Sequence, residues 1–426
     1  MKDHAVITGT GLVCALGQNP EEVWEALLAG KTGIRRVEAL AAAGFPCLFG
    51  APAEIRDRKE TGIAPGLAGL MEKHLSMLFH CSQQALVRSH PQGTAVPPEE
   101  IGFYSAMGMV DYDVDALLPA VVKSRNAQGS LDYDRFYAQG YQEIYPLYPL
   151  AMLNNVAFCQ VAISLDIRGE NAVFSPHADA GLQAFAEGVA TILEQKSRLV
   201  LAGGVSETLS PNSLSRARLA GILNTRVDSD TAPCRPFAAD RQGTVLGEGG
   251  GMVTLERESE ALVRGVSPLA RITGFGFSCR TAGETSESVD NALARAMHQA
   301  CAKARVSPME VDLVIAHGDG TVAGDLYEME ALHQVFAKRG GVLPVFASKG
   351  ALGHLLSGSP AVDLVLATQM LRHQVIPPCP SAMPLDPRAG LVMATDQPLV
   401  RPIRRILINA CSHEGPCASM VVEAFA

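Results

Sequence analysis

The chain of 426 residues lacks long apolar runs and basic blocks, and it is poor in aromatic residues, which make up 5% of it with a single tryptophan. No apolar run approaches the roughly 18 residues of a membrane-spanning helix, and the first residues carry no signal-peptide core. Lys and Arg number 35 against 44 Asp and Glu, for a formal net charge of −9. We therefore expect a cytoplasmic protein that binds neither membrane nor nucleic acid.

Paired cysteine spacings are also missing. The ten cysteines are scattered and include no Cys-x-x-Cys pair, the spacing that zinc and redox sites often use. We therefore predict free, buried thiols, with no metal site and no cofactor. The apolar fraction of 47% predicts a large core, organised as one broad α/β unit or as two fused halves.

Residues 171–181, Asn-Ala-Val-Phe-Ser-Pro-His-Ala-Asp-Ala-Gly, are the stretch around which the chain is organised. An apolar run over 156–163 precedes it, and a helix is predicted after it because apolar residues recur at three- and four-residue steps. These residues are Leu182, Phe185, Ala186, Val189, Ile192 and Leu193. The pattern predicts a strand-to-helix elbow, whose backbone N–H groups and helix dipole favour an anion or an activated nucleophile.

The phrase Ile-Thr-Gly-x-Gly occurs twice, at 7–11 and at 272–276. The first copy lies in an apolar segment that is typical of a strand running into a close turn. Two copies separated by more than half of the chain suggest an internal duplication, with the boundary between the halves in the polar segment 257–267.

Four further phrases combine glycines with polar residues. They are Arg-Pro-Phe-Ala-Ala-Asp-Arg-Gln-Gly within 233–251, His-Gly-Asp-Gly-Thr at 317–321, Lys-Gly-Ala-Leu-Gly-His at 349–354, and Asn-Ala-Cys-Ser-His-Glu-Gly-Pro-Cys-Ala-Ser at 409–419. Together with the elbow, these phrases resemble, in order and spacing, those of the β-ketoacyl-acyl-carrier-protein synthases of the thiolase superfamily. The resemblance implies an α/β, thiolase-like fold of two fused, pseudo-repeated halves, 1–260 and 261–426, in a layered αβαβα arrangement.

The same resemblance implies a degenerate active site with no catalytic residue. In that family the elbow reads Ser-Thr-Ala-Cys-x-Ser-Gly, and its cysteine accepts the acyl chain. An ungapped match puts Ala178 at the cysteine position, and alanine has no atom that attacks a thioester. His317 and His354 match the two histidines that promote decarboxylation of the malonyl unit, and Lys349 matches the family's lysine. Losing a nucleophile that acts as part of a unit costs about a million-fold in rate.

Two further departures accompany Ala178. Asp179 adds a carboxylate at the positive end of the predicted helix, where it would raise the pKa of a nearby thiol. The family's gate loop, Gly-Phe-Gly-Gly, carries a gating Phe and supplies a backbone donor to the oxyanion hole. In this chain it is replaced by Ser412, His413, Glu414 and Gly415. Because the small, flexible glycines are lost, we expect that the gate does not work in the family's way.

The missing cysteine leaves three alternatives open on the sequence alone. A one-residue slip would place His177 at the nucleophile position. Ser175, Cys411 and Cys417 are further candidates, although the two cysteines suit core packing. An engineered Cys-to-Ala change is the third alternative, but it does not account for Asp179 and the altered gate loop.

Residues 101–150 are less regular than the rest. We expect a loop or insertion around 125–140, which carries several tyrosines. In the family this region helps to line the acyl tunnel and the dimer interface, but the resemblance here is poor and assigns no roles.

The retained fold and the lost nucleophile predict a non-condensing subunit, similar to the chain-length factors of type II polyketide synthases. It would form a heterodimer with a catalytic ketosynthase and shape its acyl tunnel in polyketide or polyene synthesis. An acyl carrier protein would supply phosphopantetheine-linked chains. Chain-length factors for aromatic polyketides often carry Gln at the cysteine position and lose both histidines. This chain has Ala178 and keeps both His317 and His354, which leaves room for residual decarboxylation. Two alternatives stay open: a malonyl-carrier-protein decarboxylase that makes starter units, and an atypical catalytic β-ketoacyl synthase that works as a homodimer.

Overall fold

The structure is a computed structural model. It describes residues 3–42, 44–55, 72–90, 92–93, 95–109, 111, 113–151, 153–225, 232–281, 291–340 and 342–425.

Eleven strands of the described residues share one hydrogen-bonded order, β12-β10-β9-β14-β15-β8-β1-β7-β6-β4-β5. The N-terminal group is β1 (Ala5–Cys14), β4 (Ile101–Met107), β5 (Asn171–Phe174), β6 (Leu199–Ser206) and β7 (Gly249–Arg257). The C-terminal group is β8 (Ala270–Cys279), β9 (Leu313–Ile315), β10 (Leu343–Phe346), β12 (Leu391–Val392), β14 (Arg405–Cys411) and β15 (Pro416–Ala424). Two short ribbons lie outside this sheet: β2 (Arg35–Arg36) with β3 (Phe49–Gly50), and β11 (Val375–Ile376) with β13 (Leu399–Val400).

The two strand groups repeat the same neighbours and directions. In the first group, β1–β7 and β7–β6 are antiparallel, whereas β6–β4 and β4–β5 are parallel. In the second group, β8–β15 and β15–β14 are antiparallel, whereas β14–β9 and β9–β10 are parallel. The two Ile-Thr-Gly-x-Gly phrases lie on the equivalent strands β1 and β8. The pseudo-repeat predicted from them is therefore confirmed.

The glycines of this phrase have the same structural purpose in both halves. A Cβ atom at Gly9 or Gly11 would collide with backbone carbonyls of helix α4 (Glu72–Ser89), which packs on β1. A Cβ atom at Gly274 or Gly276 would collide with carbonyls of helix α12 (Ala292–Ala304), which packs on β8. In each half, the glycines of this phrase therefore allow an outer helix to pack closely against the strand.

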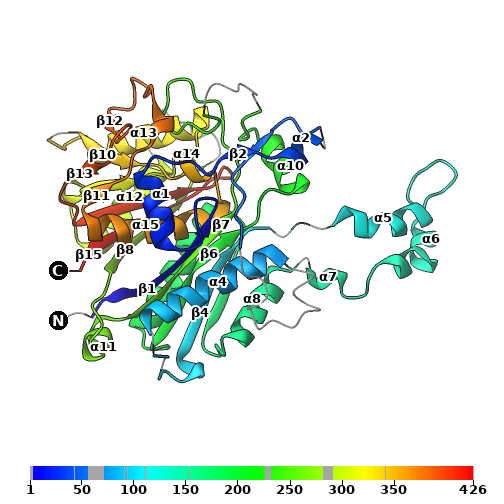
Figure 1. Cartoon of the computed structure of the whole chain (residues 1–426), viewed down its shortest axis with the longest axis horizontal. Helices are drawn as coiled ribbons and strands as arrows, with labels where there is room; N and C mark the ends of the chain where they lie inside the picture. The colour runs from blue at the N-terminus through cyan, green and yellow to red at the C-terminus, as the bar shows by residue number, and fades with distance from the viewer. Residues whose placement is uncertain are drawn as a thin grey trace.

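Helices separate and cover the two strand groups in layers (Figure 1). Helices α9 (Ala178–Leu193) and α15 (Ser359–His373) pack between the groups, and every residue of α15 from Ser359 to Leu371 is buried. Helices α4 and α8 (Asn154–Ser164) cover the outer face of the N-terminal group. On the other outer face, α12 covers the C-terminal group and packs against α13 (Val322–Phe336). The arrangement is αβαβα, as the sequence predicts.

Among the described residues, the remaining α-helices of the body are short: α1 (Pro20–Leu28), α2 (Glu38–Ala42), α7 (Tyr148–Ala151), α10 (Pro211–Leu219), α11 (Glu258–Val263) and α14 (Lys349–Leu352). Helix α1 shows why they begin where they do: Asn19 accepts the N–H of Glu22 at 2.9 Å, and Pro20 fills the first helical position. Within the described ranges, no helix has both the length and the apolar character needed to cross a bilayer.

Helices α5 (Val114–Lys123) and α6 (Tyr133–Ala138) form an arm that projects from the layered body (Figure 1). The segment around 125–140, expected as a loop or insertion, thus contains a helix. It forms because Asp132 accepts the N–H of Arg135 at 3.1 Å and caps the first turn. The arm, together with the segment 139–145 that follows α6, exposes four tyrosines, Tyr133, Tyr137, Tyr141 and Tyr145.

The phrase within 233–251 has a structural role. The N–H of Phe237 donates to Asp325 Oδ2 at 2.6 Å, and Arg241 Nη1 donates to Asp386 Oδ2 at 2.8 Å. Arg241 Nε also lies 3.5 Å from Asp325 Oδ2. Burial raises the pKa of Asp325 well above its usual range, and the donors oppose that rise. These contacts tie the phrase to helix α13, which borders the site described next.

Candidate active site

The elbow forms as predicted: β5 ends at Phe174, and helix α9 begins at Ala178. His177 precedes the helix in extended conformation and makes no capping bond with its side chain. Ala178 is 1% exposed, and Asp179 is 8% exposed in the first helical turn, where the helix dipole favours its negative charge. The position that the resemblance assigns to a nucleophile therefore holds a buried methyl group, followed by a buried carboxylate.

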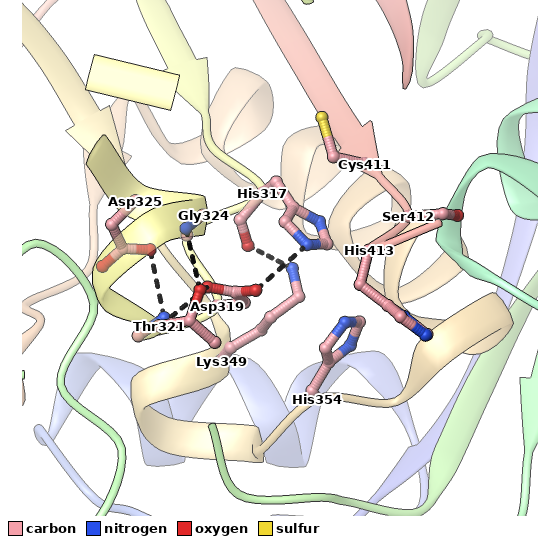
Figure 2. Close-up of polar contacts among 12 residues, drawn as sticks. His317, Asp319, Thr321, Gly324, Asp325, Lys349, His354, Cys411, Ser412 and His413 are labelled. Carbon is pink, nitrogen blue, oxygen red and sulfur yellow. Dashed lines mark hydrogen bonds and ion pairs between the residues drawn. The ribbon is translucent and has the colours of Figure 1, made fainter. Parts of the chain in front are cut away.

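His317, Lys349 and His354 come together from three segments of the C-terminal half. His317 follows strand β9, Lys349 opens helix α14, and His354 follows that helix. The two imidazole centroids are 5.1 Å apart in an edge-to-face arrangement. Lys349 is 1% exposed, and its Nζ donates to the backbone carbonyl of His317. Figure 2 shows the Lys349 side chain alongside the two rings, with its Nζ next to His317.

Both histidines are neutral at pH 7. Burial, reinforced by the positive charge of Lys349, holds the pKa of each imidazole well below its usual value. The Nδ1 of His354 accepts the N–H of Leu356 at 3.1 Å, which assigns the ring proton to Nε2. His354 can therefore donate one hydrogen bond from Nε2, as stabilisation of a developing oxyanion requires.

Glu328 on helix α13 fixes the turn that carries His317. Its carboxylate accepts the N–H groups of His317 and Gly318 at 2.9 and 2.8 Å, and Nδ2 of Asn409 donates to it at 3.0 Å. Burial raises the pKa of Glu328, and these three donors and Lys349 oppose the rise. The backbone of His317 is thus held in place by the protein itself.

Asp319 stands beside His317. Its Oδ2 lies 3.9 Å from Nε2 of His317. Its Oδ1 accepts both the N–H and the hydroxyl of Thr321, each at 2.8 Å. Thr321 in turn caps helix α13 by accepting the N–H of Gly324 at 2.9 Å. Asp319 thereby places a carboxylate next to the imidazole of His317, where any other anion would meet a like charge.

The turn between β14 and β15 is where the resemblance places the gate. The N–H of Ser412 donates to the carbonyl of Pro416 at 2.8 Å, and that of Gly415 donates to the carbonyl of Ser412 at 3.0 Å. Arg280 Nη2 donates to the carbonyls of Ser412 and His413 at 3.0 and 2.9 Å. Gly415 adopts a φ of +126°, which side chains rarely permit. The turn is therefore braced by its own backbone and by one arginine.

Three side-chain contacts tie this turn to the elbow. The hydroxyl of Ser412 donates to Asp179 Oδ1. Nε2 of His177 lies 3.1 Å from Oε2 of Glu414, and the rings of His177 and His413 meet edge to face with centroids 4.9 Å apart. Three of the four residues that replace the family's gate loop thus contact the elbow.

Two cavities meet at His413. A cavity of about 380 Å³ lies toward the C-terminal half, and its lining includes Arg280, His317, Asp319, Thr321 and Ser412. A cavity of about 300 Å³ lies over the elbow, and its lining includes Met109, Pro176, His177, Glu207 and Glu414. His413 lines both cavities, so its ring stands at the boundary between them.

The alternative nucleophiles are poorly placed for attack. Cys411 and Cys417 are cross-strand partners on β14 and β15, with Sγ atoms 3.0 Å apart. The Cys417 thiol and burial raise the pKa of Cys411 well above its usual range, which disfavours the reactive thiolate. Ser175 is exposed, and its Oγ accepts from Asn154 Nδ2 at 3.2 Å.

Comparisons with known proteins agree with this arrangement. The family model described as "Beta-ketoacyl synthase, N-terminal domain" matches residues 2–261, and "Beta-ketoacyl synthase, C-terminal domain" matches residues 269–382. The chain belongs to the β-ketoacyl synthase family. Curated relatives include two proteins named 3-oxoacyl-(acyl-carrier-protein) synthase 2. The one from Coxiella burnetii is 25% identical over 99% of both chains, and the one from Mycobacterium leprae is 28% identical over 97% of this chain and 94% of its own.

Two solved structures share the fold of this β-ketoacyl synthase homologue along its whole length. One is a type II PKS acyl-carrier protein in complex with its ketosynthase bound to the hexaketide, with a TM-score of 0.86 at 22% identity. The other is the ishigamide ketosynthase/chain length factor, with a TM-score of 0.84 at 21% identity. Both matches cover all of both chains. At these identities they show the fold alone, which is the thiolase-like fold predicted from the sequence.

Sequence reasoning missed Arg280 and the contacts between the gate turn and the elbow. No motif marks Arg280, which lies at the end of β8. The contacts between the turn and the elbow could have been predicted. Asp179 departs from the family pattern in the elbow phrase, and Ser412 and Glu414 depart from it in the phrase at 409–419; in the family, both phrases lie at the same active site.

Proposed function

We propose that this β-ketoacyl synthase homologue is a non-condensing subunit that pairs with a catalytic ketosynthase, as a chain-length factor does, and shapes its acyl tunnel in type II polyketide or polyene synthesis. The observation that carries the proposal is Ala178, a buried methyl group at the nucleophile position. Beside it, a hydrogen bond from Ser412 to Asp179 holds the turn that corresponds to the family's mobile gate. A thioester cannot form on this elbow, so condensation needs a cysteine from another chain.

The described surface supports a partner chain. Strand β5 ends the sheet, and no described strand pairs with its outer edge; proteins usually cover such an edge. Helix α8 beside it exposes Ile163 at 71%. The arm exposes its tyrosines together with Val114, Leu118 and Val122. Large apolar and aromatic side chains exposed on these elements suit contact with a partner chain. We therefore propose a heterodimer through β5, α8 and the arm, which receives chains from an acyl carrier protein. The cytoplasmic location stays a prediction.

Co-expression with a ketosynthase that keeps its cysteine tests the proposal. We expect a 1:1 complex in native mass spectrometry, with an interface typical of obligate pairs, above about 2,000 Å². The chain made alone should be poorly soluble. A stable homodimer that ignores the ketosynthase and forms β-ketoacyl product would instead support an atypical catalytic synthase.

A matched pair of surface variants locates the interface. Ile163→Glu places a charge on α8 beside the sheet edge and should abolish pairing, because a buried unpaired charge is strongly unfavourable. Val263→Glu places the same charge on α11 at a residue that is 91% exposed, and should leave pairing intact. If both variants pair equally well with the ketosynthase, the interface does not include this part of α8.

A second candidate function is decarboxylation of a malonyl carrier protein. It is favoured by the neutral pair His317 and His354 with the buried Lys349, a constellation that needs no nucleophile. Asp319 weighs against it as a like charge. The test is carbon dioxide release from malonyl carrier protein by the pair with its ketosynthase cysteine removed. If His354→Ala abolishes that release while the dimer stays folded, the decarboxylase is the better description.

A further inference from the structure

The gate turn and the elbow bring together three side chains that metal sites commonly use. His177 comes from the elbow, and His413 and Glu414 come from the turn between β14 and β15. Nε2 of His177 lies 3.1 Å from Oε2 of Glu414, and Nε2 of His413 lies 4.0 Å from Oε1 of the same carboxylate. One ligand atom from each residue lies within 4.8 Å of the other two.

The cysteine spacings predict no metal site, but this cluster contains no cysteine, and we propose that His177, His413 and Glu414 bind one divalent transition-metal ion, represented by Zn²⁺. Two imidazoles and one carboxylate are a donor set that zinc takes where one coordination position stays open. Bonds of about 2.0–2.2 Å place tetrahedral ligand atoms about 3.3 Å apart. The observed separations of 3.1 and 4.0 Å end on the two different oxygens of Glu414, and one ligand atom from each residue lies within 4.8 Å of the other two. A small movement of the side chains therefore brings the three ligand atoms to this spacing.

The surroundings allow the small adjustment that binding requires. The side chains of His413 and Glu414 are 30% and 64% exposed, so their rotamers are not fixed by packing. The side chain of His177 is 15% exposed and is held at the start of helix α9. One ligand is thus rigid and two are adaptable, and the adjustment falls on the two exposed side chains.

The ion would have a definite place in the molecule. All three ligands line the cavity of about 300 Å³ over the elbow, so the open position faces that cavity and takes water or an incoming ligand. The ion would also join the gate turn to the elbow, in addition to the bond between Ser412 and Asp179. This inference is independent of the proposed function, because the three ligands belong to one chain.

Metal binding by the full-length chain without a polyhistidine tag, in its co-expressed complex or alone, tests the proposal. After treatment with a chelator, Zn²⁺ is titrated by calorimetry, and Co²⁺ is added as a spectroscopic probe. We expect one saturable Zn²⁺ per chain and the visible absorption of low-coordinate Co²⁺. His177→Ala and His413→Ala should each weaken Zn²⁺ binding by more than about 100-fold, since loss of a ligand exceeds the effect of losing its outer-shell support.

Control variants separate this site from other histidines. His333→Ala removes a partly buried histidine whose Nε2 contacts the carbonyl of Ala389, and should leave Zn²⁺ binding unchanged. His317→Ala and His354→Ala are tested in the same way and should also leave Zn²⁺ binding unchanged. The proposal is overturned if stoichiometric binding is absent, if it survives His413→Ala, or if it is lost in His317→Ala but kept in His177→Ala. In the first case, the contact between His177 and Glu414 is an ion pair only.

Discussion

Asp179 accepts the hydroxyl hydrogen of Ser412, and this bond joins the first turn of α9 to the turn between β14 and β15. Both residues are buried, at 8% and 3% exposure. The family pattern has glycine at the turn position, where no such bond can form. A hydrogen bond to a charged group stabilises by about 1.5–3 kcal/mol, so the turn is fastened to the elbow instead of being free to gate.

Ser412→Gly should release the gate turn. We expect faster amide hydrogen exchange across 412–415 and a free energy of unfolding lower by about 1–3 kcal/mol, since a buried carboxylate loses a donor. Gln183→Ala is the matched control, because Gln183 Nε2 donates to the other oxygen of Asp179 at 2.8 Å without touching the turn. Equal exchange in the wild type and Ser412→Gly would mean that the bond does not restrain the turn.

Ala178→Cys should not create an efficient synthase. The helix N-terminus lowers the pKa of a thiol at this position, but the carboxylate of Asp179 opposes that shift. His413 and Glu414 also stand where the family has its gating Phe and a glycine. Loss of one oxyanion donor costs about 10²–10³ in rate. The measurement is acyl transfer from an acyl carrier protein, by intact mass, in a complex whose partner cysteine is removed. Product at the rate of the intact pair would show that the site still works as a synthase.

The pH dependence of stability should carry the signature of buried neutral histidines. Burial lowers the pKa of His74 to about 4, from the usual 6.5. Between these values the unfolded chain binds a proton that the folded chain does not, so stability is full above pH 6.5 and falls as the pH drops toward 4. Each such histidine contributes a slope of about 1.4 kcal/mol per pH unit.

His317 and His354 add to the same slope, because their pKa values also lie well below 6.5 in the folded chain. Denaturant unfolding at pH 7 and pH 5 measures it. His74→Gln should reduce the loss of stability between the two values, whereas substitution of the exposed His298 should not. An unchanged slope in His74→Gln would contradict this account.

Two of the ten thiols should react readily in the native protein. Cys159 and Cys279 are exposed, whereas burial raises the pKa of Cys14, Cys234 and Cys379 to about 12. An alkylating reagent at mild alkaline pH should therefore label two sites by peptide mapping. Cys159 lies on α8 beside the sheet edge, so a ketosynthase bound there should protect it while Cys279 stays reactive. Labelling of both in the complex would argue against this interface.

The sequence predicted the parts of the site that lie within single phrases. Ala178 at the elbow, and His317 with His354 at strand and helix ends, follow from local pattern and from the family resemblance. The bond between Asp179 and Ser412 does not, because it depends on how α9 packs against the far strands β14 and β15. The helix in the arm was missed for a different reason: its cap at Asp132 is a local signal, but the polar segment shows no apolar periodicity.

Strand β1 is synthesised before both of its neighbours, β7 and β8, which come from residues 249–279. At about 5–20 residues per second, on the order of 10 to 50 s pass before the second neighbour is made. Every residue of β1 is buried in the finished protein. During that interval the nascent chain carries an unpaired apolar strand, which binds chaperones or aggregates. Slower growth and added chaperones should therefore raise the yield of this chain even when its partner is already present.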